Sequence, residues 1–153
     1  MIADARREQD MLIGADQIRE LIPHSEKMCL LERVIDWNDQ SIRCETSSHV
    51  DVNNPLRRHG HVSSICGIEY AAQAMALHAA LCSDAKGTAR HGYLASARDT
   101  RCVTAYLDEH DSPLAVSAEL EFADGPRVIY SFSIESNGAT LVTGRAAVMM
   151  NQG

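Results

Sequence analysis

The chain has 153 residues, the size of one domain, and its content of 45% apolar and 23% charged residues is that of an ordinary globular protein. It carries 14 Lys and Arg against 21 Asp and Glu, a formal net charge of −7, which argues against a nucleic-acid-binding protein with its basic surface. The 5 cysteines form no CxxC pair, which argues against a disulfide framework and a zinc ribbon and is typical of the reducing cytoplasm. No secretory signal is visible at the charged start, and the longest apolar stretch (70–82) is expected to be too short to span a bilayer. These features predict a small, soluble cytoplasmic domain.

The amino-terminal region predicts an arm followed by a single domain. The charges of residues 1–13 follow no helical stripe, so we expect a flexible arm there and one domain over residues 14–153. Asp16 can cap a short helix that runs through Leu21, and Pro23 would then end it by removing a backbone donor.

Two strands and a polar loop are expected next. The apolar pattern predicts strands over residues 28–37 and 41–49, joined by a turn at Asn38-Asp39. The irregular polar stretch 50–61 follows, and loops of this kind often carry functional residues because a rigid scaffold holds them in place.

The clearest element is an Ala-rich, Leu-rich helix over residues 66–82, apolar almost all round and therefore expected to be buried. A polar linker at 83–90 and four strands separated by turns come after it, and Asn137-Gly138 is a strong signal for a tight hairpin. The expected strands cover residues 92–107, 113–123, 127–136 and 139–150. One helix wrapped by a curved antiparallel sheet, an α+β fold, is the simplest way to bury such a helix.

Glu69 stands near the start of this apolar helix, where an unpaired buried carboxylate would be costly. One interpretation is a helix cap, since a negative charge suits the first turn, although Cys66 stands where a strict capping box needs Ser or Thr. The other is a general acid whose pKa is raised by an apolar pocket and whose carboxyl is oriented by Gln73, four residues on. His78 lies roughly opposite by helical phase and is expected to be a core or interface histidine.

The loop before the helix offers the partner that a general acid needs. His59 or His61 could accept a proton, and Gly60 would let the backbone approach a ligand. The same His-x-His pair could bind zinc, but the extra ligands this would need, Cys66 and His49, have no recognised spacing, so no metal is expected. A nucleophilic Cys66 paired with His59 is a further alternative, beside the simpler one that this thiol only fills space.

The start of the helix supplies a third ingredient. Its free N–H groups, near Ser63, Ser64 and Gly67, can stabilise a developing oxyanion. An acid, a base and an oxyanion site at one helix start suit removal of a proton next to a carbonyl with loss of a β-leaving group.

Several segments together resemble a known family. Leu21-Ile22-Pro23-His24 and Leu30-Leu31-Glu32-Arg33-Val34 resemble the opening of the hotdog-fold 3-hydroxyacyl-[acyl-carrier-protein] dehydratases, and Tyr93-Leu94-Ala95-Ser96 resembles the strand after their central helix. Gly-Ile-Glu-Tyr-Ala-Ala-Gln-Ala-Met-Ala (67–76) and Asn-Pro-Leu-Arg (54–57) are most similar to the small dehydratases of aryl polyene and xanthomonadin-type pigment clusters. The resemblance covers about residues 15–150.

This resemblance implies a hotdog fold and a general acid at Glu69, with Gln73 and Gly67 as orienting and oxyanion residues. The usual Gly-His-Phe-Pro segment of the base is replaced here by His59-Gly60-His61-Val62, in a shorter loop. The base is therefore assigned to His59, with His61 and His49 as rivals.

The resemblance also implies a homodimer, or a heterodimer with a second dehydratase, in which each site takes its histidine and its acid from different subunits. No cofactor is expected, and the substrate would arrive on the phosphopantetheine arm of an acyl carrier protein. Carrier proteins are acidic, so Arg57, Arg58 and Arg98 are the expected docking residues. A hotdog acyl-thioesterase and a non-catalytic partner subunit are the alternatives, and a pure binding module would follow if Glu69 were only a cap.

Overall fold

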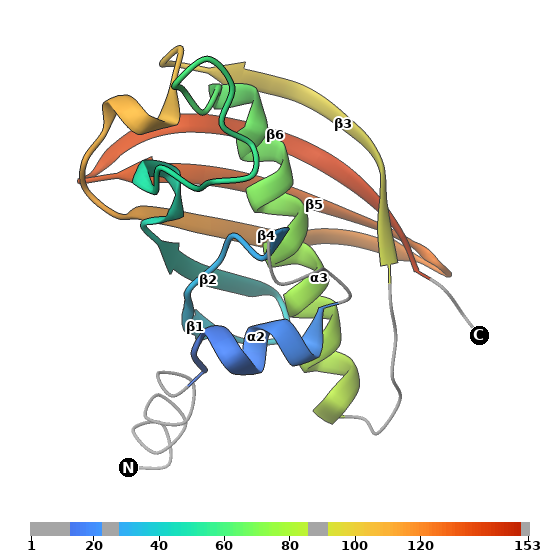
Figure 1. Cartoon of the computed structure of the whole chain (residues 1–153). Helices are drawn as coiled ribbons and strands as arrows, with labels where there is room; N and C mark the ends of the chain where they lie inside the picture. The colour runs from blue at the N-terminus through green and yellow to red at the C-terminus, as the bar shows by residue number, and fades with distance from the viewer. Residues whose placement is uncertain (1–12, 23–27, 86–91, 151–153) are drawn as a thin grey trace.

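The fold is a six-stranded antiparallel sheet that curves around one long helix, as Figure 1 shows for the computed structural model. The structure describes residues 13–22, 28–85 and 92–150. The strands lie in the order β1-β2-β4-β5-β6-β3, which places β3 at one edge of the sheet and β1 at the other. Within the described residues the helices and strands are α2 (Ala15–Leu21), β1 (Arg33–Trp37), β2 (Ser41–Thr46), α3 (Gly67–Ala85), β3 (Gly92–Cys102), β4 (Leu114–Asp124), β5 (Arg127–Ser136) and β6 (Ala139–Met150), with short 3-10 turns η2 (Ser48–Val50), η3 (Ser64–Cys66) and η4 (Leu107–Glu109).

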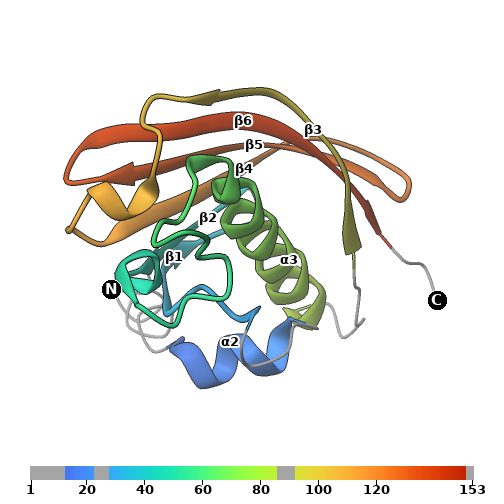
Figure 2. The same ribbon diagram turned by 45° about the horizontal axis from the view of Figure 1, so that its top comes forward.

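Helix α3 is the centre of the core because other elements meet it on most sides. It lies in the concave side of the sheet, and α2 packs against it on the side away from the sheet (Figure 2). Tyr70, Met75 and Leu77 are completely or almost completely buried, as is Ile18 of α2. A fully buried side chain of this size contributes roughly 1.5–3 kcal/mol to the free energy of unfolding, so this helix holds the two layers together. The α+β hotdog architecture expected from the sequence is confirmed.

The same helix is long and apolar enough to cross a membrane. The segment Ser64–Ser83 has 20 residues and a mean hydropathy of 1.2, so the apolar helix is longer than the stretch 70–82 that was expected to be too short to span a bilayer. However, 56% of the segment is buried inside the fold, and its buried Gln73 and His78 donate hydrogen bonds to protein carbonyls. A central core helix needs the same apolar composition, so this length is not evidence for a membrane span.

The strands of the second half agree closely with the sequence patterns. Strands β5 and β6 have the predicted bounds, and Asn137 (φ 51°) and Gly138 (φ 80°) form the expected tight turn between them. Strand β3 is shorter than predicted, because it ends at Cys102 and a loop leads to η4. Helix α3 is longer, because it continues to Ala85 through the first residues of the expected linker.

Three predictions in the first half need correction. The strand expected over 28–37 is regular only from Arg33, because side chains take the backbone groups of Leu30: its N–H donates to Gln73 Oε1 and its carbonyl accepts from Thr46 and Ser48. The second strand ends at Thr46, and η2 follows in place of its last residues. The N-cap of α2 is Gly14 and not Asp16, whose carboxylate instead pairs with Arg19.

Several of the predicted segments lie largely outside the described residues. Of the expected arm, only Ile13 is described, and its carbonyl accepts a hydrogen bond from the N–H of Val34 at 3.1 Å. Pro23, His24 and most of the expected linker at 83–90 lie outside the described ranges.

Candidate active site

Glu69 and Gln73 form a fixed pair in the first turns of α3. Gln73 is completely buried, and its Nε2 donates to Glu69 Oε1 at 3.2 Å and to the Met28 carbonyl at 2.6 Å. Its Oε1 accepts from the Leu30 N–H at 2.9 Å. The amide therefore has one possible orientation, because a flipped amide would turn its NH₂ towards another donor. The predicted orienting role of Gln73 thus has a structural basis.

A buried hydrogen-bond network continues from Leu30 to the polar loop. The Leu30 carbonyl accepts from Ser48 Oγ at 2.8 Å, and Ser48 Oγ lies 2.8 Å from the hydroxyl of Tyr70, the neighbour of Glu69. Asn54 donates to that hydroxyl at 3.0 Å and to the Ser48 carbonyl at 2.7 Å. The two segments that resemble the pigment dehydratases, 54–57 and 67–76, therefore contact each other through Asn54 and Tyr70. Sequence reasoning missed this network, since all but one of these bonds join residues 16 to 22 positions apart.

Gly67 begins α3 at a point of close approach between the helix and the sheet. A Cβ atom there would lie 2.7 Å from Ile134 Cδ1 and 3.2 Å from Val142 Cγ2. The structure thus gives this glycine a packing reason, in addition to the oxyanion role predicted for the helix start. Ser64, in the preceding η3 turn, is buried, and its Oγ has no hydrogen-bond partner among the described residues.

His59 lies at the tip of a tight turn. The N–H and carbonyl of Arg58 exchange hydrogen bonds with those of His61, and both residues between them have positive φ: His59 at 52° and Gly60 at 82°. This is the pattern of a two-residue hairpin turn, in which the left-handed region favours Gly and Asn. The side chain of His59 is exposed and makes no hydrogen bond to the described residues.

His61, directly after this turn, is held by a carboxylate. Its Nδ1 lies 3.0 Å from Asp108 Oδ2, and its ring stacks on Tyr106 with centroids 4.2 Å apart. Asp108 Oδ1 accepts from the N–H of Val62 at 2.8 Å. The sequence carried no local signal for Asp108, which lies 47 residues from His61 and directly follows the strand expected over 92–107.

The other candidates are held in structural positions. His49 is fully buried with Nε2 2.7 Å from the His110 carbonyl, and burial lowers its pKa. His78 bonds to the Tyr130 hydroxyl and the Asn38 carbonyl, as expected for a core histidine, and burial lowers its pKa too. Burial raises the pKa of the Cys66 thiol, which favours the neutral form over a nucleophilic thiolate. Within the described ranges, no three His, Cys, Asp or Glu side chains gather as a metal site would need.

The three arginines predicted to dock a carrier protein are not equivalent. Arg57 is turned into the loop, where its guanidinium donates to the carbonyls of Asp51, Gly60 and His49. Arg58 is exposed, although one of its nitrogens donates to nearby loop carbonyls. Arg98 lies on the outer face of the sheet, opposite Arg145 of β6, away from the α3 side.

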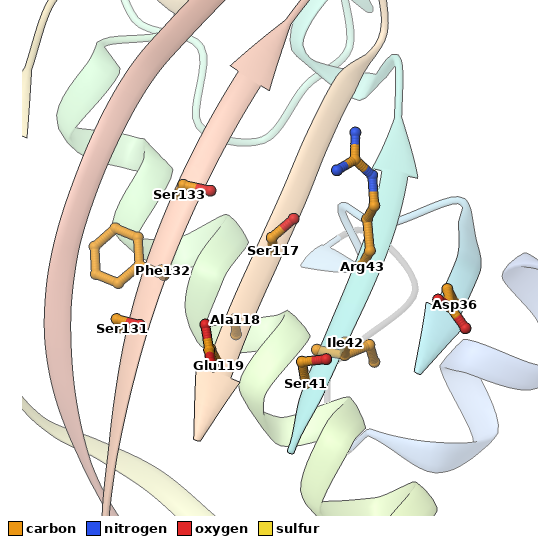
Figure 3. A pocket seen from close by; sticks show the side chains of 10 residues that line it. All are labelled: Asp36, Ser41, Ile42, Arg43, Ser117, Ala118, Glu119, Ser131, Phe132 and Ser133. Atoms are coloured by element: carbon orange, nitrogen blue, oxygen red, sulfur yellow. The ribbon is translucent and has the colours of Figure 1, made fainter. Parts of the chain in front are cut away.

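Two hollows on the outer face of the sheet hold none of the predicted catalytic residues. One, of about 350 Å³, is lined by polar side chains of β1, β2, β4 and β5, among them Arg43 and Ser117, with α3 behind the sheet (Figure 3). The second, of about 460 Å³, lies between Arg98, Arg127 and Arg145. Glu69, the predicted acid, belongs to α3 on the other side of the sheet, so neither hollow is the predicted site.

Comparison with solved structures places the chain in a structural class. The ApeI:P dehydratase heterocomplex of Xenorhabdus doucetiae matches with a TM-score of 0.79 and 26% identity, over 88% of this chain and 91% of that chain. A thioesterase of Pseudomonas aeruginosa matches with a TM-score of 0.66 and 12% identity over 91% and 94% of the two chains, and a thioesterase of Haemophilus influenzae with 0.66 and 10% over 93% of each. The two thioesterases show the fold alone. The fold thus defines a hotdog protein.

A family model assigns the chain to a narrower group within this class. The model of the ApeP-like family, described as ApeP dehydratase, matches residues 16–152. The chain therefore belongs to the ApeP-like dehydratase family and is a hotdog dehydratase. No curated protein matches the chain.

Proposed function

We propose that the protein removes water from a 3-hydroxyacyl thioester carried by an acyl carrier protein and gives a trans-2-enoyl thioester. The observation that carries this proposal is the carboxyl of Glu69, held by a Gln73 amide that is itself tied to the backbone at Met28 and Leu30. A general acid needs a fixed carboxyl at the leaving group, and this pair supplies one. Membership of the ApeP-like family supports the same class of reaction.

In the proposed reaction a histidine removes the α-proton of the thioester. Electrons move towards the carbonyl oxygen, where N–H groups at the start of α3 stabilise the developing negative charge. The bond from Cβ to the hydroxyl oxygen then breaks while Glu69 donates its proton to that oxygen. The products are the enoyl thioester and one water, with the proton from Cα left on the histidine.

We further propose that a second hotdog chain, identical or related, completes the site. Glu69 is only half-buried in the single chain, and a covering partner would exclude the water that competes for its proton. Among the described strands β3 is an edge of the sheet, with Tyr93 and Leu94 exposed on it, and such edges are normally covered. The similar Xenorhabdus protein is part of a heterocomplex, which supports either type of dimer.

For the carrier protein, Arg58 is the strongest remaining docking candidate near α3. Arg57 is committed to loop carbonyls, so we expect it to shape the loop more than to bind the carrier. Arg98 would serve only a carrier that also reaches the outer face of the sheet. The five cysteines are all free thiols, which supports a cytoplasmic location for this reaction.

The test is incubation with a synthetic 3-hydroxyacyl carrier-protein thioester, followed by intact-mass analysis. Loss of one water from the carrier-bound chain is the expected result. Release of the free carrier thiol would identify a thioesterase instead. An inactive chain that restores turnover when mixed with a second dehydratase subunit would identify a non-catalytic partner.

A further inference from the structure

We propose that Asp108 is a positioning residue that makes His61, and not His59, the base of this site. It would do so by accepting the Nδ1–H of His61, which leaves Nε2 as the basic nitrogen. This assignment rests on the proposed dehydratase function, and it deepens it by naming the base and the group that orients it.

The carboxylate of Asp108 is fixed at both oxygens. Oδ2 lies 3.0 Å from His61 Nδ1, and Oδ1 accepts the N–H of Val62 at 2.8 Å. The Asp108 side chain is 13% exposed, and Arg57 Nη1 approaches Oδ2 to 3.8 Å. Because Tyr106 stacks on the imidazole at an interplanar angle of 20°, the ring is held in its plane as well as at one nitrogen. Precise placement of this kind is what proton transfer requires.

The charges around the pair keep the carboxylate ionised. Partial burial alone would raise the pKa of Asp108, but the hydrogen bonds from Val62 and His61 outweigh it and lower that pKa. Charged or titratable groups close by include Arg57, at 3.8 Å, His49, whose pKa burial lowers, and Tyr106, which stacks on the ring of His61. An ionised carboxylate accepts only, so the nitrogen facing it carries the proton and the far nitrogen is free in the neutral ring. The same carboxylate stabilises the imidazolium that forms when the base takes a proton.

His59, His49 and His78 lack this arrangement. His59 is exposed at a turn tip with no hydrogen bond to the described residues. His49 and His78 are buried, and each has a ring nitrogen bonded to a backbone carbonyl. Of these four described histidines, only His61 combines a carboxylate partner with an exposed ring face.

The pair also lies at the start of α3, on a surface suited to a second chain. Ser64 N–H donates to the Ala105 carbonyl and Leu107 N–H to the Val62 carbonyl, so the segment after His61 is paired with the segment before Asp108. These two segments carry three exposed apolar side chains, Ile65, Val103 and Tyr106, which are 54%, 74% and 36% exposed. A partner chain that covers these side chains would exclude water from the base. It would also bring the base close to a carboxyl group of the partner chain.

The decisive variant is Asp108→Asn, because the structure fixes which way the new amide faces. The Val62 N–H needs an acceptor, so the amide oxygen takes that place and the NH₂ turns towards His61 Nδ1. The amide then donates where the carboxylate accepted, and the proton moves to Nε2, the nitrogen the reaction needs to be bare. Glu109→Gln is the matched control, since Glu109 is the exposed neighbour that binds Thr104 and not His61.

The tautomer is read from ¹⁵N chemical shifts of histidine-labelled protein without substrate. We expect the Nδ1–H form at His61 in the unmodified chain and in Glu109→Gln, and the Nε2–H form in Asp108→Asn. An Nε2–H tautomer in the unmodified chain would overturn the proposal. Because no substrate is involved, this result is independent of whether the reaction assigned to the protein is correct.

The rate completes the test. In Asp108→Asn we expect kcat to fall by about 10²–10⁴ with KM nearly unchanged, because the loss concerns proton transfer and not binding. The competing assignment is tested by His59→Asn, a substitution that the left-handed turn position accepts. A full rate in Asp108→Asn together with a lost rate in His59→Asn would return the base to His59. No dehydration by the unmodified chain, alone or with a partner subunit, would refute the proposed function while leaving the tautomer result intact.

Discussion

Gln73 shows how one buried amide connects the acid to the rest of the fold. It bonds the backbone of Met28 and Leu30 on one side and Glu69 on the other, so removing it leaves the buried Leu30 N–H and the partly buried Met28 carbonyl without their bonds. Each unsatisfied buried group costs about 1–3 kcal/mol. We predict that Gln73→Met, of similar volume, lowers the free energy of unfolding by about 2–4 kcal/mol in urea titrations. Gln40→Met on the exposed β1–β2 turn is the control, and equal stability of both variants would contradict this role for Gln73.

Two buried histidines set the pH dependence of stability. Burial lowers the pKa of His49 and of His78, so both are neutral in the fold while the unfolded chain takes up protons near pH 6.5. As pH falls below about 6.5 the unfolded state binds more protons, and the free energy of unfolding falls by up to about 1.4 kcal/mol per pH unit for each histidine. Urea midpoints measured between pH 7.5 and 5.5 should therefore decrease. His78→Gln should show a smaller slope, and an unchanged midpoint in the unmodified chain would contradict the neutral assignment.

At the level of elements, α3 depends on a residue without a side chain at its first position. A methyl group at Gly67 would meet Ile134 and Val142 of β5 and β6, and overpacking of this kind costs about 1–3 kcal/mol. We predict that Gly67→Ala lowers the thermal midpoint, as followed by circular dichroism. Gly14→Ala is the control, since its Cβ would have open space around it. A more stable Gly67→Ala protein would show that helix propensity outweighs the contact.

The elements that the sequence predicted best are those with local signals. The turn at Asn137-Gly138 and the Ala-rich run of α3 each follow from neighbouring residues alone, and both were found where expected. The prediction that residues 28–32 belong to a strand was wrong, because side chains distant in sequence, such as Gln73, form hydrogen bonds with their backbone groups. Propensity carries no information about such competition.

The same contrast between local signals and contacts of distant residues applies to the candidate site. Glu69 and Gln73 stand four residues apart on one helix, so spacing predicted their contact. Asp108 could not be found in this way, because it reaches His61 only after η4 folds back against the segment before α3. The short turn at residues 58–61 also decides where His59 and His61 lie, and its geometry depends on two positive φ values that the sequence suggests only at Gly60.

For the whole molecule, the free edge of β3 predicts self-association or a heterodimer. Leu94 pairs with the buried Val148, which places it on the α3 face of the edge strand, yet it is 37% exposed in the single chain. A second copy would bury it. We predict that Leu94→Glu raises the dimer dissociation constant at least about tenfold, which light scattering across a dilution series would measure. Phe122→Glu on the outer face is the control and should keep the dimer, whereas a dimer unaffected by Leu94→Glu would place the interface elsewhere.

Glu69 is the proposed proton donor in the dehydration. The most direct measurement is intact-mass analysis of a 3-hydroxyacyl carrier-protein thioester incubated with the unmodified chain or with Glu69→Gln, each alone and with a partner dehydratase subunit. The glutamine keeps the shape and the contact with Gln73 but has no acidic proton, so we predict a correctly folded protein whose rate of water loss is lower by about 10²–10⁴. A folded Glu69→Gln protein that removes water at the full rate would contradict it.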